Sequence, residues 1–455
     1  MDQHELSPTD KFVAPVLTEV GLTRMERLAP RPTKIADTGL SEAFLADLIA
    51  KHLLDGGVLR MSDMVERVKL AGPIIESVLN FMRKEARIEV RGTHGNGSGN
   101  SASGNLRYAL TERGRTSAQD AMYRSGYVGP APMPLEKYVE VAKAQTVHGH
   151  RIDRAAMADA FSGIIIRPDL VDKLGPAMNS GRAVFIYGPA GTGKTFITQH
   201  LVRLFPDTTL IPYSIVINEV IVEVFDPLKH RLAATDLPNP NVMLERGHDP
   251  RFALCRRPIV IAGGELTADM LDIHYDAATR RFQAPLQLKA NNGIFIIDDM
   301  GRQRVAPETV FNRWIVPLEE KIDYLNLGSG QHFSVPFDTI LVFSTNLHPL
   351  DLADEAFLRR IGYKIEFPYL LESEYEQIWK QFCAEHEIVC EPDVFDFAIN
   401  ELHGKNRKPL LPCHPRDLLS IAAERATYEG HGRLVNTESL SWAWTNYFVS
   451  MKPGT

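Results

Sequence analysis

Apolar residues recur along the chain with two different spacings, and the spacing changes at defined points. Over residues 151–367, short apolar runs of strand length alternate with stretches in which apolar residues recur at helical spacing. The run 183–187 is one such strand, and Ile197, Leu201 and Leu204 follow it at helical spacing. Strands that alternate with helices are typical of a parallel sheet covered by helices. We therefore predict an α/β core over residues 151–367.

The pattern becomes purely helical after Phe367. Apolar residues recur at helical spacing in four segments, which are residues 372–385, 392–402, 415–428 and 437–447. Helices of this length that carry one apolar face pack against each other as a small bundle. We predict a C-terminal helical lid over residues 368–455.

The N-terminal part begins with a stretch rich in Pro and Thr and without clear periodicity, so that residues 1–39 are interpreted as an arm. Residues 40–127 then show three short helical patterns and two strand patterns, at residues 41–54, 62–68, 73–84, 86–90 and 106–110. Residues 91–105, rich in Gly, Ser and Asn, separate the two strands. This order predicts an α+β domain of the winged-helix type.

Two further features bear on this N-terminal domain. Residues 108–115 resemble the exit from strand to helix that many winged-helix proteins share. A proline-rich stretch at residues 129–134 then marks residues 128–150 as a linker to the α/β core.

Composition narrows the class of protein. The 455 residues carry a formal net charge of -7 with 24% charged residues, which argues against a nucleic-acid surface over the whole chain. No run approaches the ~20 apolar residues that a membrane helix needs, and the polar start lacks a signal segment. The four cysteines lack the spacing of metal ligands. We expect a cytoplasmic protein that does not insert into membranes.

A glycine-rich loop joins the strand 183–187 to the helix that follows. Its residues are Gly188, Pro189, Ala190, Gly191, Thr192, Gly193, Lys194 and Thr195. Glycines let backbone N–H groups approach phosphates, and the helix N-terminus adds a positive dipole end. Lys194 can neutralise a γ-phosphate, and Thr195 can offer its hydroxyl to Mg²⁺. The loop predicts a site for ATP and Mg²⁺; the alternative, a chance glycine-rich turn, is disfavoured by the flanking strand and helix.

Two carboxylates, Asp298 and Asp299, end the apolar run 293–297. At the carboxyl end of a parallel strand they would face the phosphates. Asp298 can then hold Mg²⁺ through water, and Asp299 can orient or deprotonate the attacking water. The alternative is an ordinary buried strand followed by an Asp turn.

Three more polar positions follow in order along the chain. Asn346 ends the apolar run 341–345 and can sense the γ-phosphate, although alone it would be interpreted as a helix-capping residue. Arg359 and Arg360 follow as a pair, and arginine supplied across a subunit boundary stabilises charge on the transferred phosphoryl group. Arg416 starts a helix of the predicted lid, where it can reach the γ-phosphate. For Arg359, Arg360 and Arg416, the alternative interpretation is an arginine at the solvated surface.

In this order the segments resemble the Walker A, Walker B, sensor 1, arginine-finger and sensor 2 motifs of the AAA+ superfamily of ring-forming ATPases. The resemblance covers roughly residues 150–455. Residues 285–293 look like the lead-in of MoxR-like ATPases, whereas residues 343–347 and 357–360 look like AAA proteins proper, so the clade stays open within a bacterial group. The resemblance implies Mg²⁺-dependent ATP hydrolysis in a homo-oligomer, with a hexameric ring favoured. It also implies that Arg359 or Arg360 acts on the nucleotide of the next subunit.

Asp299 departs from this family pattern, because most members have Glu there. The shorter side chain can slow water activation, since a displacement of about 1 Å can cost on the order of 10²-fold in rate. Two functions remain open. The first is an ATPase that remodels or moves a macromolecular partner. The second is a DNA-binding ATP switch of the initiator or helicase-loader kind with slow hydrolysis.

The N-terminal domain is expected to recognise a protein rather than DNA. Its glycine-rich residues 92–105 contain no Lys or Arg, and these side chains supply most non-specific affinity for DNA. The alternative is a cationic cluster in which basic side chains gather at the base of the two strands, namely Arg83, Lys84, Arg87, Arg91 and Arg107.

Overall fold

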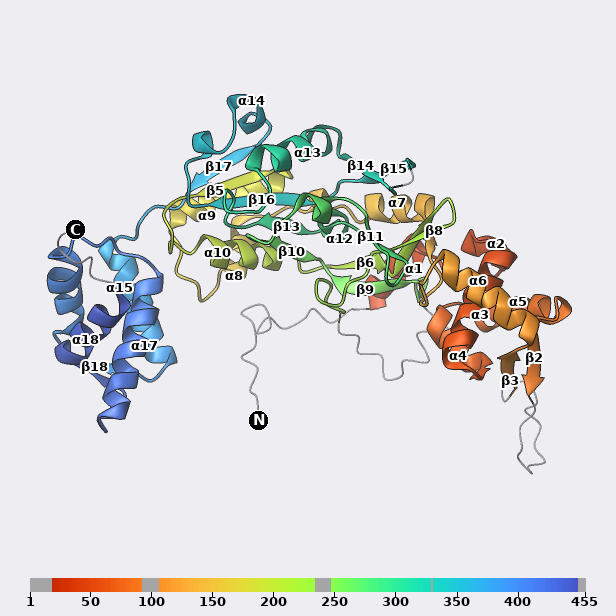
Figure 1. The fold of residues 1–455 in the computed structure, drawn as a ribbon. Helices are drawn as coiled ribbons and strands as arrows, with labels where there is room; N and C mark the ends of the chain where they lie inside the picture. Colours follow the sequence, from red (N-terminus) through yellow and green to blue (C-terminus); the bar gives the residue numbers. More distant parts are fainter. Residues whose placement is uncertain (1–18, 92–105, 234–246, 329, 449–455) are drawn as a thin grey trace. The chain divides into compact units, whose positions relative to one another are not determined.

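The computed structural model describes residues 19–91, 106–233, 247–328 and 330–448 of the chain (Figure 1). They form two compact units, each assembled from several segments. The described residues within Met1–Gly149, Phe205–Phe295 and Thr309–Ile340 form the first unit, and those within His150–Leu204, Ile296–Glu308 and Leu341–Thr455 form the second. Within the described residues, no helix is both long and apolar enough to cross a membrane.

The first unit begins with a helical subdomain that contains a small antiparallel sheet. The sheet has the strand order β1-β3-β2. The helices are α3 (Glu42–Gly56), α4 (Met61–Val68), α5 (Gly72–Lys84) and α6 (Glu112–Arg124), and the strands are β1 (Leu59–Arg60), β2 (Ile88–Arg91) and β3 (Arg107–Leu110). Ser41 caps α3 by accepting a hydrogen bond from Phe44 N, and the buried residues of α3 and α5 form the centre of its core. All three predicted helices and both predicted strands are present.

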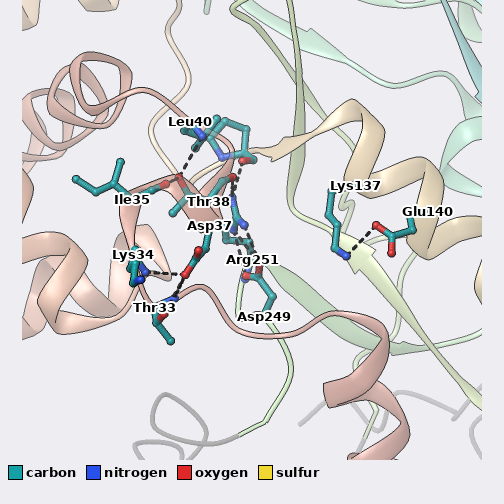
Figure 2. A network of polar contacts seen from close by, with 11 residues as sticks. Thr33, Lys34, Ile35, Asp37, Thr38, Leu40, Lys137, Glu140, Asp249 and Arg251 are labelled. Atoms are coloured by element: carbon teal, nitrogen blue, oxygen red, sulfur yellow. Dashed lines mark hydrogen bonds and ion pairs between the residues drawn. The ribbon is translucent and has the colours of Figure 1, made fainter.

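The expected arm is in part folded. Residues 19–39 contain α1 (Glu19–Leu28) and α2 (Ile35–Thr38), and Met25 and Ala29 are buried. Figure 2 shows that Arg251, only 2% exposed, donates to Thr38 O and forms an ion pair with Asp249. Separating the buried Arg251 guanidinium group from Thr38 O and Asp249 would cost free energy. These contacts therefore hold the segment around Thr38 in the first unit. The arm prediction missed it because the contacts are made by residues more than 200 positions away.

Part of the expected linker is also helical. Helix α7 (Leu135–Ala144) buries Tyr138, Val141 and Ala142, which have helical spacing, and Lys137 pairs with Glu140 on its surface (Figure 2). Strand β4 (Met133–Pro134) precedes it and pairs in parallel with β7 (Ser214–Ile217). Residues 133–144 therefore belong to the core of the first unit.

The rest of the first unit is built largely from hairpins. Its five-stranded sheet has the order β11-β12-β8-β7-β4. The strands of this part of the unit are β6 (Thr208–Pro212), β7 (Ser214–Ile217), β8 (Val220–Glu223), β9 (Phe252–Arg256), β11 (His274–Asp276), β12 (Arg281–Gln283), β14 (Ile322–Asn326) and β15 (His332–Pro336). Strands β6 and β9, and likewise β14 and β15, form separate two-stranded sheets. The helices are α12 (Leu286–Lys289) and α13 (Pro307–Glu320). Asn218 and Glu219 both have positive φ, which fits the tight turn that joins β7 to β8.

A second five-stranded sheet has the order β10-β13-β16-β5-β17. Its strands are β10 (Ile259–Ala262), β13 (Ile294–Ile297), β16 (Ile340–Thr345), β5 (Val184–Tyr187) and β17 (Tyr363–Glu366). Strands β16 and β17 each pair in parallel with β5. Helices α8 (Arg154–Ala160), α9 (Pro168–Ser180), α10 (Lys194–His200) and α14 (Glu355–Leu358) connect or flank these strands (Figure 1). The predicted parallel sheet is therefore confirmed.

Helices alone follow Phe367, apart from the short pair β18 (Val389–Cys390) and β19 (Leu434–Val435). They are α15 (Glu372–Glu385), α16 (Val394–Asp396) with the π-helix η5 (Phe397–Gly404), α17 (Cys413–Tyr428) and α18 (Thr437–Tyr447). Tyr375, Trp379 and Leu418 lie in their common core. The four predicted helices are present; the predicted domain boundaries stay a prediction, since the two compact units cut across residues 151–367.

Candidate functional site

The glycine-rich loop lies between the end of β5 at Tyr187 and the start of α10 at Lys194. Gly188 has φ of 143°, and a Cβ atom there would lie 2.3 Å from the carbonyl oxygen of Phe367. No side chain fits at that distance. Gly193 has φ of 82°, a left-handed conformation that glycine adopts without strain. The loop therefore requires glycine at both positions for steric reasons.

Lys194 is only 6% exposed and lies inside the loop. Its Nζ donates to Gly188 O, Pro189 O and Asn346 Oδ1, each at 2.8 Å. Burial lowers the pKa of Lys194, while Asp298 and Asp299 oppose that shift. A buried ammonium that has carbonyl and amide partners but no carboxylate in contact is suited to an anionic ligand.

Thr195 and Asp298 meet at the carboxyl end of β13. Thr195 Oγ1 donates to Asp298 Oδ2 at 2.7 Å, although the two residues are 103 positions apart. Hydroxyl and carboxylate oxygens are the ligands that Mg²⁺ prefers, and Mg²⁺ usually keeps several waters and binds substrate phosphates. The donor set therefore fits this ion, with Thr195 and Asp298 as its protein ligands.

Asn346 links the lysine to the second carboxylate. Its Oδ1 accepts from Lys194 Nζ, and its Nδ2 donates to Asp299 Oδ1 at 3.2 Å. Asn346 directly follows β16 and Asp298 follows β13, so the sheet brings these groups together at one edge. Asp299 has φ of 51°, which Asp adopts more readily than most residues. Five predicted site residues are thus in one hydrogen-bonded cluster: Lys194, Thr195, Asp298, Asp299 and Asn346.

A cavity of about 640 Å³ opens beside this cluster. Its polar end is formed by the loop residues 190–195 together with Asp298, Asp299 and Asn346. Apolar side chains also line it, among them Ile164, Ile166, Phe196, Ile378 and Phe382, together with the polar side chains of Glu374, Gln381 and Glu385. A cavity that combines a glycine-rich loop with apolar walls suits a nucleoside triphosphate, and the volume lies within the usual range for ligand pockets.

The lid residue Arg416 lines the same cavity. Its side chain is 66% exposed, and its Nε donates to Asp417 Oδ1 at 2.8 Å. This hydrogen bond raises the pKa of Arg416. The structure therefore brings Arg416 to the cavity but pairs it with its neighbour rather than with the phosphate loop.

Arg359 and Arg360 do not line this cavity. The Arg359 side chain is 80% exposed and lies 3.6 Å from Glu355, and Arg360 Nη1 donates to Ala356 O. The structure thus leaves both arginines outside their own chain's site. Their role toward a neighbouring subunit stays a prediction.

Sequence reasoning missed several residues of the cavity. Arg167 and Arg302 line it, as does the segment 163–166 ahead of α9. Arg302 is three residues beyond Asp299, and its backbone N–H donates to Asp299 O. An arginine three residues after the paired carboxylates was the available signal for Arg302. The apolar segment 163–166 gave none, because only the folded chain brings it to the loop.

The chain is similar to one family model over part of its length and to solved structures at low sequence identity. A domain of unknown function, DUF8689, matches residues 371–446. No curated protein matches the chain in sequence. Among solved structures, the Thermotoga maritima RuvB Holliday junction branch migration motor is 15% identical, with 61% of this chain and 68% of that chain covered and a TM-score of 0.34. NtrX from Brucella abortus is 13% identical, with 74% and 68% covered and a TM-score of 0.40.

The fold assignment therefore rests on the chain's own geometry. The phosphate loop follows the first strand of a parallel sheet, and the carboxylates and Asn346 follow two neighbouring strands of it. This is the arrangement of an α/β P-loop NTPase core.

Proposed function

We propose that this protein is a Mg²⁺-dependent ATPase of the AAA+ type. The hydrogen-bonded cluster of Lys194, Thr195, Asp298, Asp299 and Asn346 beside a nucleotide-sized cavity carries the proposal. Such a cluster supplies a phosphate counter-charge, metal ligands and a base within one site.

Each residue has a defined task in hydrolysis. Lys194 neutralises charge on the β- and γ-phosphates, which replace the carbonyl partners that its ammonium group has in this structure. Thr195 and Asp298 would hold Mg²⁺, which would supply positive charge beside the phosphate oxygens. Asp299 accepts the proton of the attacking water, and its hydrogen bond to Asn346 fixes the carboxylate in place. Arg416 contacts the γ-phosphate and so couples the position of the lid to the bound nucleotide.

The proposed active form is a ring of identical subunits, with a hexamer favoured. Arg359 and Arg360 are exposed or turned toward their own helix, and neither lines the cavity of its own chain. An arginine from a neighbouring subunit would complete the site, because charge on the transferred phosphoryl group needs such a donor.

Hydrolysis would remodel or move a protein partner that the N-terminal winged-helix-like domain recruits. The glycine-rich residues 92–105 lack Lys and Arg but lie outside the described residues. Arg87, one member of the possible cationic cluster, donates to Asp47 at 2.6 Å and is largely buried. These two observations favour a protein over DNA as the partner.

A specific observation supports the second candidate, a DNA-binding ATP switch. Arg60 and Arg91 are both directly opposite Arg107 in the sheet β1-β3-β2. Side chains opposite each other in antiparallel strands lie on the same face, so these three exposed arginines form one row. Glu89 pairs with Arg91 and reduces its charge. Phosphate groups would bind such a row.

Replacing Lys194 with Ala tests the proposal. The phosphates would lose their main counter-charge in a site of low dielectric, so we expect ATP binding and phosphate release to be lost. Binding of a fluorescent ATP analogue and release of phosphate are the measurements. Lys173→Ala, at an exposed position of α9, is the matched control and should leave both unchanged. Retained nucleotide affinity in the Lys194 variant would reject the site.

A further inference from the structure

A second cavity, of about 330 Å³, lies within the first unit and shares no residue with the nucleotide site. Three elements of that unit enclose it: helix α3, the C-terminal end of α6, and the turn between β7 and β8, with Phe282 of β12 beside them. Neither the proposed ATPase reaction nor the proposed partner recognition uses this cavity.

Lys51 of α3 lines the cavity and is only 4% exposed. Its Nζ donates to the backbone carbonyl of Ser125 at 3.1 Å. Among the described residues, no carboxylate lies within ion-pair distance of this ammonium group. Buried charges in proteins are normally paired, because an unpaired one forfeits its hydration without compensation.

The nearest carboxylate cannot serve as that partner. Asp47, one turn earlier on α3, accepts from Arg87 through Oδ1 and from Arg124 through Oδ2, each at 2.6 Å. Two guanidinium groups therefore already share its single negative charge. Lys51 adds a third cation, so the α3 and α6 side of the cavity has an excess of positive charge.

The other elements around Lys51 do not remove this excess. Arg281 of β12 adds positive charge and lies 3.5 Å from Glu223 of β8, while Glu219 in the turn is exposed. Burial lowers the pKa of Lys51 to about 8; Asp47 opposes that shift, and Arg124 and Arg281 reinforce it. The fold thus maintains a destabilised ammonium group at the wall of a cavity.

The remainder of the lining combines apolar side chains with the polar residues Ser41, Ser125, Asn218 and Glu219. Phe44 and Leu48 of α3, Ile221 of β8 and Phe282 of β12 line the cavity together with small residues. The volume is at the lower end of the range for small-molecule sites. A ligand here would need an anionic group and a short apolar body.

We propose that this cavity binds a small organic carboxylate, whose anionic group pairs with Lys51 and whose apolar body packs against Phe44, Ile221 and Phe282. Because α3, α6 and the β7–β8 turn all contribute to the walls, the bound acid stabilises their junction. The site is separate from the nucleotide site, with which it shares no lining residue.

Benzoate is the first probe, with benzamide as its neutral counterpart, and titration calorimetry on the full chain is the measurement. We expect benzoate to bind with a dissociation constant of about 1 mM or below, and benzamide to bind at least about tenfold more weakly. Binding needs the protonated amine, so affinity should fall about tenfold between pH 7 and pH 9. Equal binding of acid and amide, or no benzoate binding at about 10 mM, would overturn the proposal.

Lys51→Met removes the charge at similar volume and should weaken benzoate binding at least about tenfold. Lys84→Met, at an exposed position of α5, should not change it. The Lys194→Ala variant should also bind benzoate normally, which separates this site from the ATPase. Unchanged benzoate affinity in Lys51→Met would contradict the assignment.

A second measurement covers the case in which Lys51→Met does not fold. In the wild-type protein, acetic anhydride should acetylate the Lys51 amine at a rate that benzoate slows and benzamide does not, as read by peptide mass spectrometry. Acetylation that is equally fast with and without benzoate would reject the proposal.

Discussion

At the scale of single residues, the proposed mechanism assigns phosphate binding and water activation to different parts of the chain. Lys194 and Thr195 belong to the loop and its helix, whereas Asp299 and Asn346 follow two different strands. The hydrogen bond between Asn346 Nδ2 and Asp299 Oδ1 holds a carboxylate that is one methylene shorter than the Glu of most AAA+ ATPases. Under the proposed mechanism, Asp299 is the residue at which hydrolysis can be removed without loss of nucleotide binding.

We expect Asp299→Asn to bind ATP with nearly wild-type affinity but to turn it over about 10²–10⁴-fold more slowly, because an amide cannot accept the proton of water. Phosphate release and equilibrium binding of a fluorescent nucleotide check the two parts separately. Asp269→Asn, a carboxylate of η3 (Ala268–Leu271), is the control. Turnover within a few-fold of wild type would show that another group is the base.

At the scale of elements, the β1-β3-β2 sheet distinguishes the two candidate functions. The register places Arg60, Arg107 and Arg91 side by side, whereas Arg87 is held by Asp47. The sequence alone suggested Arg87 and not Arg60, because only strand pairing reveals which residues are opposite one another.

If the N-terminal domain recognises a protein rather than DNA, the full chain should bind DNA only weakly. We then expect a dissociation constant above about 1 μM for a short DNA duplex at physiological salt. A salt titration of binding checks this, with wild type compared with a triple Arg60, Arg91 and Arg107→Gln variant. Arg113→Gln, an exposed arginine 3.7 Å from Glu85, is the control. Tighter binding that falls steeply with salt and is lost only in the triple variant would favour the DNA switch.

At the scale of the whole molecule, the proposed ATPase mechanism requires an arginine from a neighbouring subunit. Neither Arg359 nor Arg360 lines its own chain's cavity, and helix α14 ends at Leu358 just ahead of them. A ring would place this helix end near the γ-phosphate of the next subunit.

We expect Arg360→Ala to keep nucleotide binding while turnover falls by about 10³-fold, the scale known for arginine fingers. Arg359→Ala is the matched variant, and the larger loss identifies the finger. In the wild type, turnover per subunit should rise with protein concentration as rings assemble. A turnover number that stays flat from nanomolar to micromolar, in a protein that stays monomeric with ATP, would reject a shared site.

The sequence by itself determined the parts whose signals are local. Strands and helices around the phosphate loop and the four lid helices follow from periodicity and turn residues within short windows. The loop glycines are equally local, because backbone conformation and a close approach fix them. The residues of the cluster were identified from their order along the chain, before any distance was known.

Only the tertiary structure decided what depends on contacts between distant segments. Thr195 and Asp298, 103 positions apart, meet because parallel strands end at a common edge. Arg251 binds the carbonyl of Thr38 and so folds the expected arm into the first unit. The sequence alone predicts that Lys51 is an ordinary helical lysine. Only the folded chain buries it beside α6 and the β7–β8 turn, where none of the described carboxylates forms an ion pair with it. Burial and pairing are properties of neighbours in space, which hydrophobic periodicity does not specify.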